Sequence, residues 1–317
     1  MAVTHSPLLA NPPWISGEDV RSSVGVGEAI RAIQGSLESG LDPARDAARS
    51  VVEVAHGQLL LMPAEILDFV GVKIASVAPG NPALTLARIQ GIYVLMDARS
   101  LAPLALLDGV ALTTLRTPAV SAAAALFLAP TVVNHLVVFG SGPQARVHID
   151  ALLTIREISR ITVVGRDHDR AAALAARVSS RGIDSGVGSA ADVADAQLIV
   201  CATTASTPLF DGALVADNSC TIAVGSHTPT DREYDSALAR RAQVVVEDLA
   251  TARREAGDVV IPIAEGVIDP GSLVALRDIV LGTVAVDQGR PRVFKSVGMS
   301  WQDLVVASAV YRARSPQ

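Results

Sequence analysis

A short glycine-rich segment is the first stretch whose residue types could do chemistry. Residues 136–139 are continuously apolar, and the segment 140–145, Gly-Ser-Gly-Pro-Gln-Ala, follows them directly. This pattern predicts a buried strand, a tight turn and a helix, with a second apolar run at 161–164 at the spacing of a strand-helix-strand unit. Glycine lets backbone approach a pyrophosphate, and a helix N-terminus offers free N–H groups to an anion. The expected dinucleotide-binding residues are Gly140, Ser141, Gly142, Gln144 and Ala145, the last at the third glycine position.

The residues after the second apolar run bear on which nicotinamide cofactor would bind. An acidic side chain there holds the ribose hydroxyls of NAD, whereas an arginine accommodates the 2′-phosphate of NADP. Here the run continues with Gly165, Arg166 and Asp167. We therefore expect NADPH, with Arg166 at the phosphate. NADH stays possible, because a register shift of one residue would bring Asp167 to the ribose.

Three basic residues are candidates for binding a substrate anion. Arg116 borders an Ala-rich run, Lys73 lies in an apolar strand-like run, and Arg49 has more polar surroundings. A charge in an apolar environment is costly unless it is paired, and a guanidinium matches a carboxylate with two parallel hydrogen bonds. Two alternatives are open: each arginine pairs with a local carboxylate such as Asp46 or Asp108, and Lys73 points to solvent from its strand.

Other polar residues carry weaker signals. The six histidines are scattered without metal-ligand spacing and no cysteine joins them, so we predict no metal site. Cys201 and Cys220 lie in apolar runs and are expected to be free core thiols. Asn81 either touches substrate or serves as a turn residue. His227, with an unperturbed pKa of about 6.5, either assists proton transfer or shapes its loop.

Composition excludes several classes of function. The 317 residues are 50% hydrophobic but only 3% aromatic, which suits a core of Ala, Val, Leu and Ile. A net charge of −6 and the lack of a basic run argue against nucleic acid. No uninterrupted apolar run approaches the roughly 18 residues of a membrane span. Residues 1–13 lack the pattern of a signal peptide, so we expect a cytoplasmic protein.

Hydrophobic periodicity predicts an α/β protein. Residues 19–37 have helical spacing with a break near Gly25, and residues 49–107 contain short strand-like runs typical of an antiparallel sheet. Thr117 and Pro118 are suited to begin a buried helix. Strands and helices then alternate, which predicts a doubly wound parallel Rossmann sheet. A last helix is expected over 300–314, with Asp303 placed for a capping box.

Short motifs are distributed over almost the whole chain. In order, they are Arg49-Ser-Val-Val, Leu61-Met-Pro63, Lys73, Pro79-Gly-Asn-Pro82, Leu107-Asp-Gly109, Leu115-Arg-Thr117, the glycine-rich turn, Ala202-Thr-Thr204, Val224-Gly225, Glu233-Tyr-Asp235, Gly257-Asp-Val259 and Val293-Phe-Lys-Ser-Val-Gly298. This set resembles the ornithine cyclodeaminase and mu-crystallin family of NAD(P)-dependent enzymes. The resemblance implies a homodimer, with an α+β substrate-binding and dimerisation domain (1–117, completed by 292–317) and a Rossmann dinucleotide-binding domain (118–291).

The resemblance also implies roles for individual residues. Arg49 and Arg116 stand at the family's substrate-binding arginine positions, where they would clamp a carboxylate. Lys73 would lie beside the substrate and donate a hydrogen bond or a proton. The cofactor positions that the resemblance adds are Thr117, Thr203, Val224 and Gly225.

Several reactions are consistent with this family. Its cyclodeaminases carry a carboxylate two residues after the Val-Gly motif, where this chain has His227. We therefore predict NAD(P)H-dependent reduction of a small cyclic imino acid, such as 1-pyrroline-2-carboxylate, to the L-amino acid. The alternatives are ornithine cyclodeamination, an alanine-dehydrogenase-like activity, and a non-catalytic NADP-dependent binding protein. Retention of Lys73, Arg49 and Arg116 together argues against the last.

Overall fold

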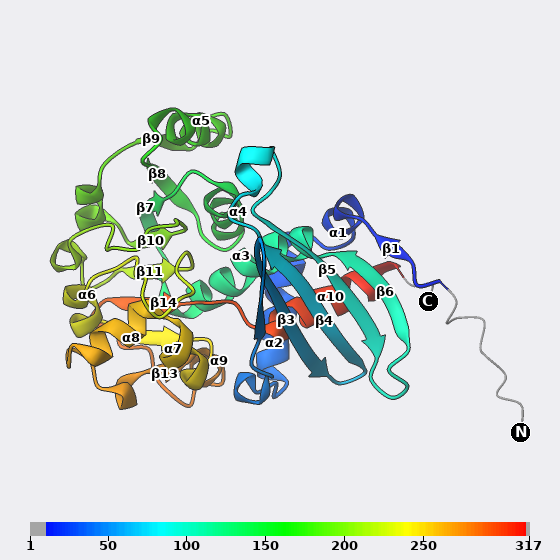
Figure 1. Ribbon diagram of the computed structural model, residues 1–317. Coiled ribbons are helices and arrows are strands. Elements are labelled where there is room, and N and C mark those ends of the chain that lie inside the picture. The colour runs from blue at the N-terminus through cyan, green and yellow to red at the C-terminus, as the bar shows by residue number, and fades with distance from the viewer. Residues whose placement is uncertain (1–10, 315–317) are drawn as a thin grey trace, which may run out of the picture. The chain divides into compact units, whose positions relative to one another are not determined.

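The chain divides into two compact units (Figure 1). The computed structural model describes residues 11–314, so the expectations for residues 1–10 and 315–317 fall outside the described part. Unit 1 comprises Met1–Thr117 and Met299–Gln317, and unit 2 comprises Pro118–Gly298. Each unit has its own sheet and is described by itself.

Unit 1 is built on a six-stranded sheet in the order β1-β6-β5-β4-β3-β2. Neighbouring strands are antiparallel, as predicted, except for the parallel pair β1 and β6. The strands are β1 (Trp14–Ile15), β2 (Ser50–Val54), β3 (Gly57–Ile66), β4 (Phe69–Val77), β5 (Ile89–Asp97) and β6 (Pro103–Asp108). The helices are α1 (Gly17–Ser23), α2 (Val26–Glu38), α10 (Ser300–Arg314) and the 3-10 turns η2 (Pro43–Arg45) and η3 (Asn81–Leu84). One face of the sheet, here called the inner face, packs against α10.

Helix α3 (Gly109–Leu128) begins earlier than predicted. Asp108 Oδ1 accepts the backbone N–H groups of Val110 and Ala111, so this side chain caps the helix. Thr117, the expected N-cap, lies inside the helix, and its Oγ1 donates to the carbonyl of Thr113. The prediction was wrong because Asp108 already caps the helix upstream of Thr117, so Pro118 lies inside α3 despite the hydrogen bond that an interior proline removes and the clash it makes with the preceding turn. By length and composition α3 could span a membrane, but 67% of its most apolar window is buried within the protein.

Unit 2 is built on an eight-stranded parallel sheet in the order β13-β12-β14-β11-β10-β7-β8-β9. The strands are β7 (Val133–Phe139), β8 (Ile158–Val164), β9 (Asp184–Val187), β10 (Leu198–Cys201), β11 (Cys220–Ala223), β12 (Gln243–Val246), β13 (Val274–Ala275) and β14 (Arg292–Lys295). The helices are α4 (Pro143–Leu152), α5 (His168–Ser179), α6 (Ser236–Arg241), α7 (Leu249–Glu255), α8 (Gly257–Ala264), α9 (Leu276–Val280) and the 3-10 turns η4 (Ala190–Asp195), η5 (Gly212–Leu214) and η6 (Pro270–Ser272). The predicted α/β fold with a doubly wound parallel sheet is confirmed. Strand order reverses between β7 and β10, and ligands of such sheets bind at this switch point.

The segment 292–298 lies in unit 2, whereas the sequence analysis assigned it to the other domain. Its strand β14 pairs with both β11 and β12 inside the parallel sheet. Arg292 anchors the strand, because its buried guanidinium donates to the carbonyls of Leu128, Asp217 and Asn218. These bonds satisfy a charge that would be costly to bury alone. The boundary therefore falls after Gly298 rather than after Pro291.

Tight packing on the inner face of unit 1 provides a test of the fold. Tyr93 of β5 is fully buried, and a Cβ on Gly71 of β4 would lie 2.3 Å from its Oη. Gly71→Ala is expected to lower the free energy of unfolding by about 1–3 kcal/mol, since the ring must move within a filled core. The matched control is Gly186→Ala in β9, where a Cβ meets nothing within 4 Å. Urea unfolding should separate the two variants, and equal midpoints would contradict this packing.

Candidate active site

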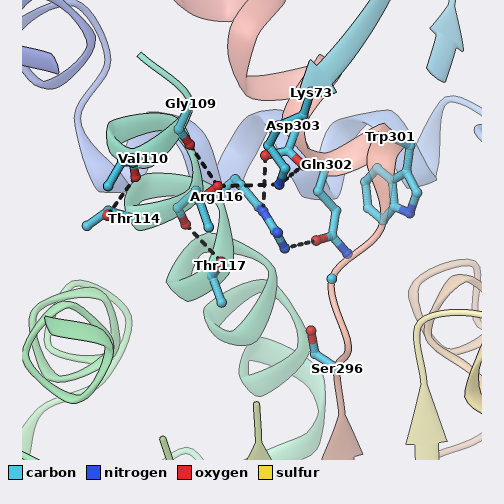
Figure 2. Close-up of polar contacts among 12 residues, drawn as sticks. Lys73, Gly109, Val110, Thr114, Arg116, Thr117, Ser296, Trp301, Gln302 and Asp303 are labelled. Carbon is cyan, nitrogen blue, oxygen red and sulfur yellow. Dashed lines mark hydrogen bonds and ion pairs between the residues drawn. The ribbon is translucent and has the colours of Figure 1, made fainter. Parts of the chain in front are cut away.

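A buried ion triad lies on the inner face of unit 1 (Figure 2). The Lys73 Nζ is 2.6 Å from Asp303 Oδ2, and the Arg116 Nε is 3.3 Å from Asp303 Oδ1. Lys73 comes from the middle of β4, Arg116 from α3, and Asp303 from the first turn of α10. Because none of the three is more than 6% exposed, their charges interact with little screening by water.

Two neutral side chains complete the triad's hydrogen bonds. Gln302 Oε1 accepts from Arg116 Nη1 at 2.7 Å, and Lys73 Nζ donates to Thr113 Oγ1 at 3.3 Å. Among the described residues, the Nη2 group of Arg116 and the third N–H of Lys73 donate no hydrogen bond. An ammonium and a guanidinium that each have an N–H group without an acceptor can together bind an anion such as a carboxylate.

The environment tunes Lys73 for proton exchange. Burial lowers the pKa of Lys73 from 10.5 to about 8. The positive charges of Arg116 and Arg49 add to the lowering, whereas Asp303 opposes it. Tyr93 lies directly across the strand pair from Lys73, and burial raises the pKa of this phenol well above 10, so it stays protonated. An amine with a pKa near 8 can donate or accept a proton close to neutral pH.

The partner of Arg116 differs from both carboxylates considered in the sequence analysis. Asp108 caps α3, and Asp46 Oδ2 accepts the backbone N–H of Trp301 at 3.0 Å. Asp303 holds Arg116 instead, and its expected place in a capping box is wrong because its carboxylate is buried in two ion pairs. Nor does Lys73 point to solvent.

Sequence reasoning missed the roles of Asp303 and Gln302. The signal available in the sequence was a polar pair, Gln302 and Asp303, in the first turn of a predicted helix whose following residues are apolar. In the structure both side chains are fully buried. Arg49 is half-buried just before β2, and its charge acts on Lys73. Asn81 donates from Nδ2 to the carbonyl of Ala87, six residues further along the chain, which fits a turn residue.

In unit 2 the glycine-rich turn has the form expected of a phosphate cradle. Gly140 follows β7 with a φ of +113°, and a Cβ there would lie 2.4 Å from the carbonyl oxygen of Ala202. Gly142 is the N-cap of α4 and provides no side-chain cap, and a Cβ on it would meet nothing within 4 Å. Ala145 is buried behind the turn. The first N–H groups of α4 are therefore left for an anion.

The residues beside the turn also fit a bound dinucleotide. The buried Oε1 of Gln144 accepts no hydrogen bond among the described residues. Ser141 Oγ lies 3.5 Å from the Cβ that Gly165 would carry. Asp167 Oδ1 accepts the backbone N–H of Arg170 at 3.0 Å, so this carboxylate caps α5. Arg166, the residue before it, is exposed.

Glu233 ties together the ends of two central strands. Its Oε1 accepts the backbone N–H and the hydroxyl of Thr203, at 2.9 and 2.7 Å, beyond the end of β10. Its Oε2 accepts the N–H of Gly225 at 2.6 Å, beyond the end of β11. Val224 continues the strand pairing by donating to the carbonyl of Cys201. The carboxylate thus fixes Thr203, Val224 and Gly225 at one edge of the sheet.

The chain contains only two lysines, Lys73 and Lys295, and both are buried in ion pairs. Lys295 Nζ is 2.7 Å from Asp258 Oδ2 and donates to the carbonyl of Ser226 at 2.6 Å. Asp258 Oδ1 in turn accepts the backbone N–H of Glu233 at 2.6 Å. The pair therefore holds both ends of the loop 226–233.

The other candidate residues lie outside the two ion-pair clusters. His227 is exposed on this loop, with Nδ1 3.4 Å from the carbonyl oxygen of Gly225. Thr117 lies inside α3 rather than at a helix N-terminus. Within residues 11–314, no group of three or more His, Cys, Asp or Glu side chains could hold a metal ion. Cys201 and Cys220 are free and buried, and burial raises the pKa of Cys220 to about 12.

The second lysine provides a stability test. Lys295→Met leaves the carboxylate of Asp258 buried without a counter-charge and should lower the free energy of unfolding by about 3–5 kcal/mol. The double variant Lys295→Met/Asp258→Asn should recover part of this loss, because Asn keeps an oxygen at Oδ1 and carries no charge. Denaturant unfolding of both proteins measures the difference. A double variant less stable than the single one would show that the ion pair is not the source of the loss.

Comparison with known proteins places the chain in a family. It is 33% identical over 311 residues to a Delta(1)-pyrroline-2-carboxylate reductase of Bacillus cereus, covering 94% of this chain and 95% of that protein. The structure of the Thermococcus litoralis Delta(1)-pyrroline-2-carboxylate reductase in complex with NADH and L-proline superposes with a TM-score of 0.89 at 29% identity, covering 95% and 97%. An archaeal alanine dehydrogenase dimer with bound NAD gives a TM-score of 0.90 at 25% identity, covering 95% of each chain. The profile of the ornithine cyclodeaminase/mu-crystallin family matches residues 16–316. As its motifs predict, the chain belongs to the ornithine cyclodeaminase/mu-crystallin family.

Proposed function

We propose that this protein is an NAD(P)H-dependent oxidoreductase that reduces a small cyclic imino acid, such as 1-pyrroline-2-carboxylate, to the L-amino acid. The observation that carries the proposal is the buried triad, in which an amine with a pKa of about 8 lies beside a guanidinium. The relative from Bacillus cereus is a reductase of this class, and the Thermococcus litoralis structure contains NADH and L-proline.

Each basic residue would have one task. Arg116, assisted by Arg49, would bind the substrate carboxylate through donors that the triad leaves available. The Lys73 ammonium would donate a proton to the imine nitrogen and would be reprotonated from solvent. The nicotinamide cofactor, when bound, supplies the hydride for the imine carbon. One hydride and one proton balance the reduction of a C=N bond to an amine.

The competing reactions receive less support. The cyclodeaminases of this family have a carboxylate at the position where this chain has His227. The imidazole ring of His227 is exposed on the loop 226–233. Expelling ammonia needs an additional acid-base group, whereas reduction needs one proton source. Formation of proline from ornithine with stoichiometric ammonia and no net NAD(P)H change would contradict the proposal.

Titration of Lys73 generates a pH prediction. The value of kcat/KM for imine reduction should fall about tenfold per pH unit above roughly 8, since the ammonium is the donor. The reverse oxidation needs the neutral amine and should rise up to the same pH. Lys73→Arg should abolish this inflection, because a guanidinium does not deprotonate in this range.

A second pair of variants tests the assignment of roles. Lys73→Ala should lower kcat for reduction by roughly 10²–10⁴-fold while leaving NADPH binding intact. The matched variant His227→Ala should cost less. Cofactor binding followed by nicotinamide fluorescence, together with steady-state kinetics, measures both effects. A Lys73→Ala enzyme with normal turnover would exclude Lys73 as the proton donor.

For the cofactor we propose NADPH in preference to NADH. Similar solved structures contain NADH or NAD, which supports a nicotinamide dinucleotide as the cofactor. Two observations support the preference for NADPH over NADH. The carboxylate of Asp167 caps α5, and Arg166, just after β8, is exposed. A guanidinium there is suited to the 2′-phosphate.

Cofactor preference can be measured with one variant and one control. Arg166→Ala should raise KM for NADPH roughly 10- to 100-fold, since a hydrogen bond to a charged group contributes about 1.5–3 kcal/mol. KM for NADH should not change. Arg181→Ala removes another exposed arginine, beyond the end of α5, and should leave both values unaltered. Equal losses with NADPH and NADH would contradict the assignment of Arg166.

We also propose that the protein is a homodimer whose partner covers the outer face of the unit 1 sheet, opposite α10. This face carries exposed apolar side chains, among them Val52 (46%), Leu59 (36%) and Ile92 (39%). Val52 pairs with Leu59, and Ile74 pairs with Ile92, so the residues form rows across neighbouring strands. A contiguous apolar surface of this kind marks an interface. The similar archaeal alanine dehydrogenase is a dimer.

A further inference from the structure

The carboxylate of Asp303 has an unusual position among the charges of unit 1. It is fully buried, and each of its oxygens contacts a different cation: Oδ2 the ammonium of Lys73, and Oδ1 the guanidinium of Arg116. Among the described residues, no other carboxylate forms an ion pair with either cation. The two basic residues that the proposed reaction uses are therefore connected through one acidic group.

The start of α10 is built to hold this carboxylate in place. Asp46 accepts the backbone N–H of Trp301, which fixes the first turn of the helix. Gln302, the residue before Asp303, accepts from Nη1 of Arg116, so consecutive residues bind two different nitrogens of one guanidinium. The positive end of the helix dipole also favours a negative charge in the first turn.

We propose that Asp303 is a positioning residue for the reaction: it sets the separation between the proton donor Lys73 and the carboxylate-binding Arg116. Its role in turnover rests on the proposed function, whereas its hold on the two cations does not. The carboxylate also cancels one of the two positive charges, so the triad keeps a single net positive charge, which complements a substrate with one carboxylate.

The charges around Lys73 make the proposal measurable. Asp303 approaches it from α10, Arg116 from α3, and Arg49 from the segment before β2, while the phenol of Tyr93 faces it from β5. Of these groups only Asp303 raises the pKa of Lys73, and both arginines lower it. Removing the Asp303 charge should therefore move the titration of Lys73 to lower pH.

The kinetic test compares Asp303→Asn with Asp303→Glu. The Asn variant should shift the alkaline limb of the kcat/KM profile for imine reduction by one pH unit or more toward acid, since a nearby opposite charge shifts a pKa by about 1–3 units. It should also raise KM for the imine, because Arg116 loses its support. The Glu variant keeps the charge but displaces it, so its limb should stay near the wild-type pH while kcat falls. A purely structural role would lower the yield of folded enzyme without moving the limb.

A second measurement does not depend on turnover. Selective ¹³Cε, ¹⁵Nζ labelling of lysine should give two side-chain NMR signals, one from Lys73 and one from Lys295. In Asp303→Asn the Lys73 signal should titrate at lower pH than in the wild type, and the Lys295 signal, paired with Asp258, should not move. Asp68→Asn, at an exposed position, is the control and should change neither signal.

The outcomes separate the two proposals. If the wild type reduces no imino acid, the proposed function fails, and the NMR titration still decides whether Asp303 controls Lys73. If the wild type is a reductase and Asp303→Asn leaves both the pH limb and the Lys73 titration unmoved, the positioning role is overturned. Should the Asn variant not fold, the Asp303→Glu profile decides, because unchanged kcat and KM would show that the position of the carboxylate is immaterial.

Discussion

Burying two cations at one carboxylate is the constraint on which unit 1 depends. A buried charge without a partner is strongly unfavourable, so Asp303 offsets much of the cost of burying Lys73 and Arg116. Asp303 is 230 residues away from Lys73 in the sequence. The last helix, α10, must therefore dock on a sheet whose strands all come from the first third of the chain. Unit 1 therefore has its complete polar cluster only when the C-terminal helix is docked on the sheet.

Unit 2 also contains a buried lysine paired with a carboxylate, which there supports loops instead of a substrate site. Lys295 and Asp258 form a fully buried pair, and Glu233 beside them accepts three hydrogen bonds from the segments that follow β10 and β11. Burial raises the pKa of Glu233, while the charge of Lys295 and the hydroxyl of Thr203 oppose that shift. Rigid, ionic supports of this kind hold loops at the edge of a parallel sheet without a large aromatic core.

Local patterns in the sequence predicted the local structure. The glycine-rich turn, the alternation of strands and helices, and the helix over 300–314 depend on neighbouring residues, and the structure has them. Failures came where distant residues decide. Thr117 and Pro118 have the types of a helix start, but Asp108 caps the helix well before Thr117. Asp303 has the type of a capping residue, and only the folded chain brings it to Lys73 and Arg116.

The confinement of lysine to two buried positions has a practical consequence for handling the protein. Lys73 is 4% exposed and Lys295 is 1% exposed, so the folded surface described here presents arginine but no lysine amine. Reagents that acylate amines, including succinimidyl esters of dyes and activated resins, should therefore react slowly with both lysines of the folded protein. Lysine modification that becomes fast on heating would report unfolding directly.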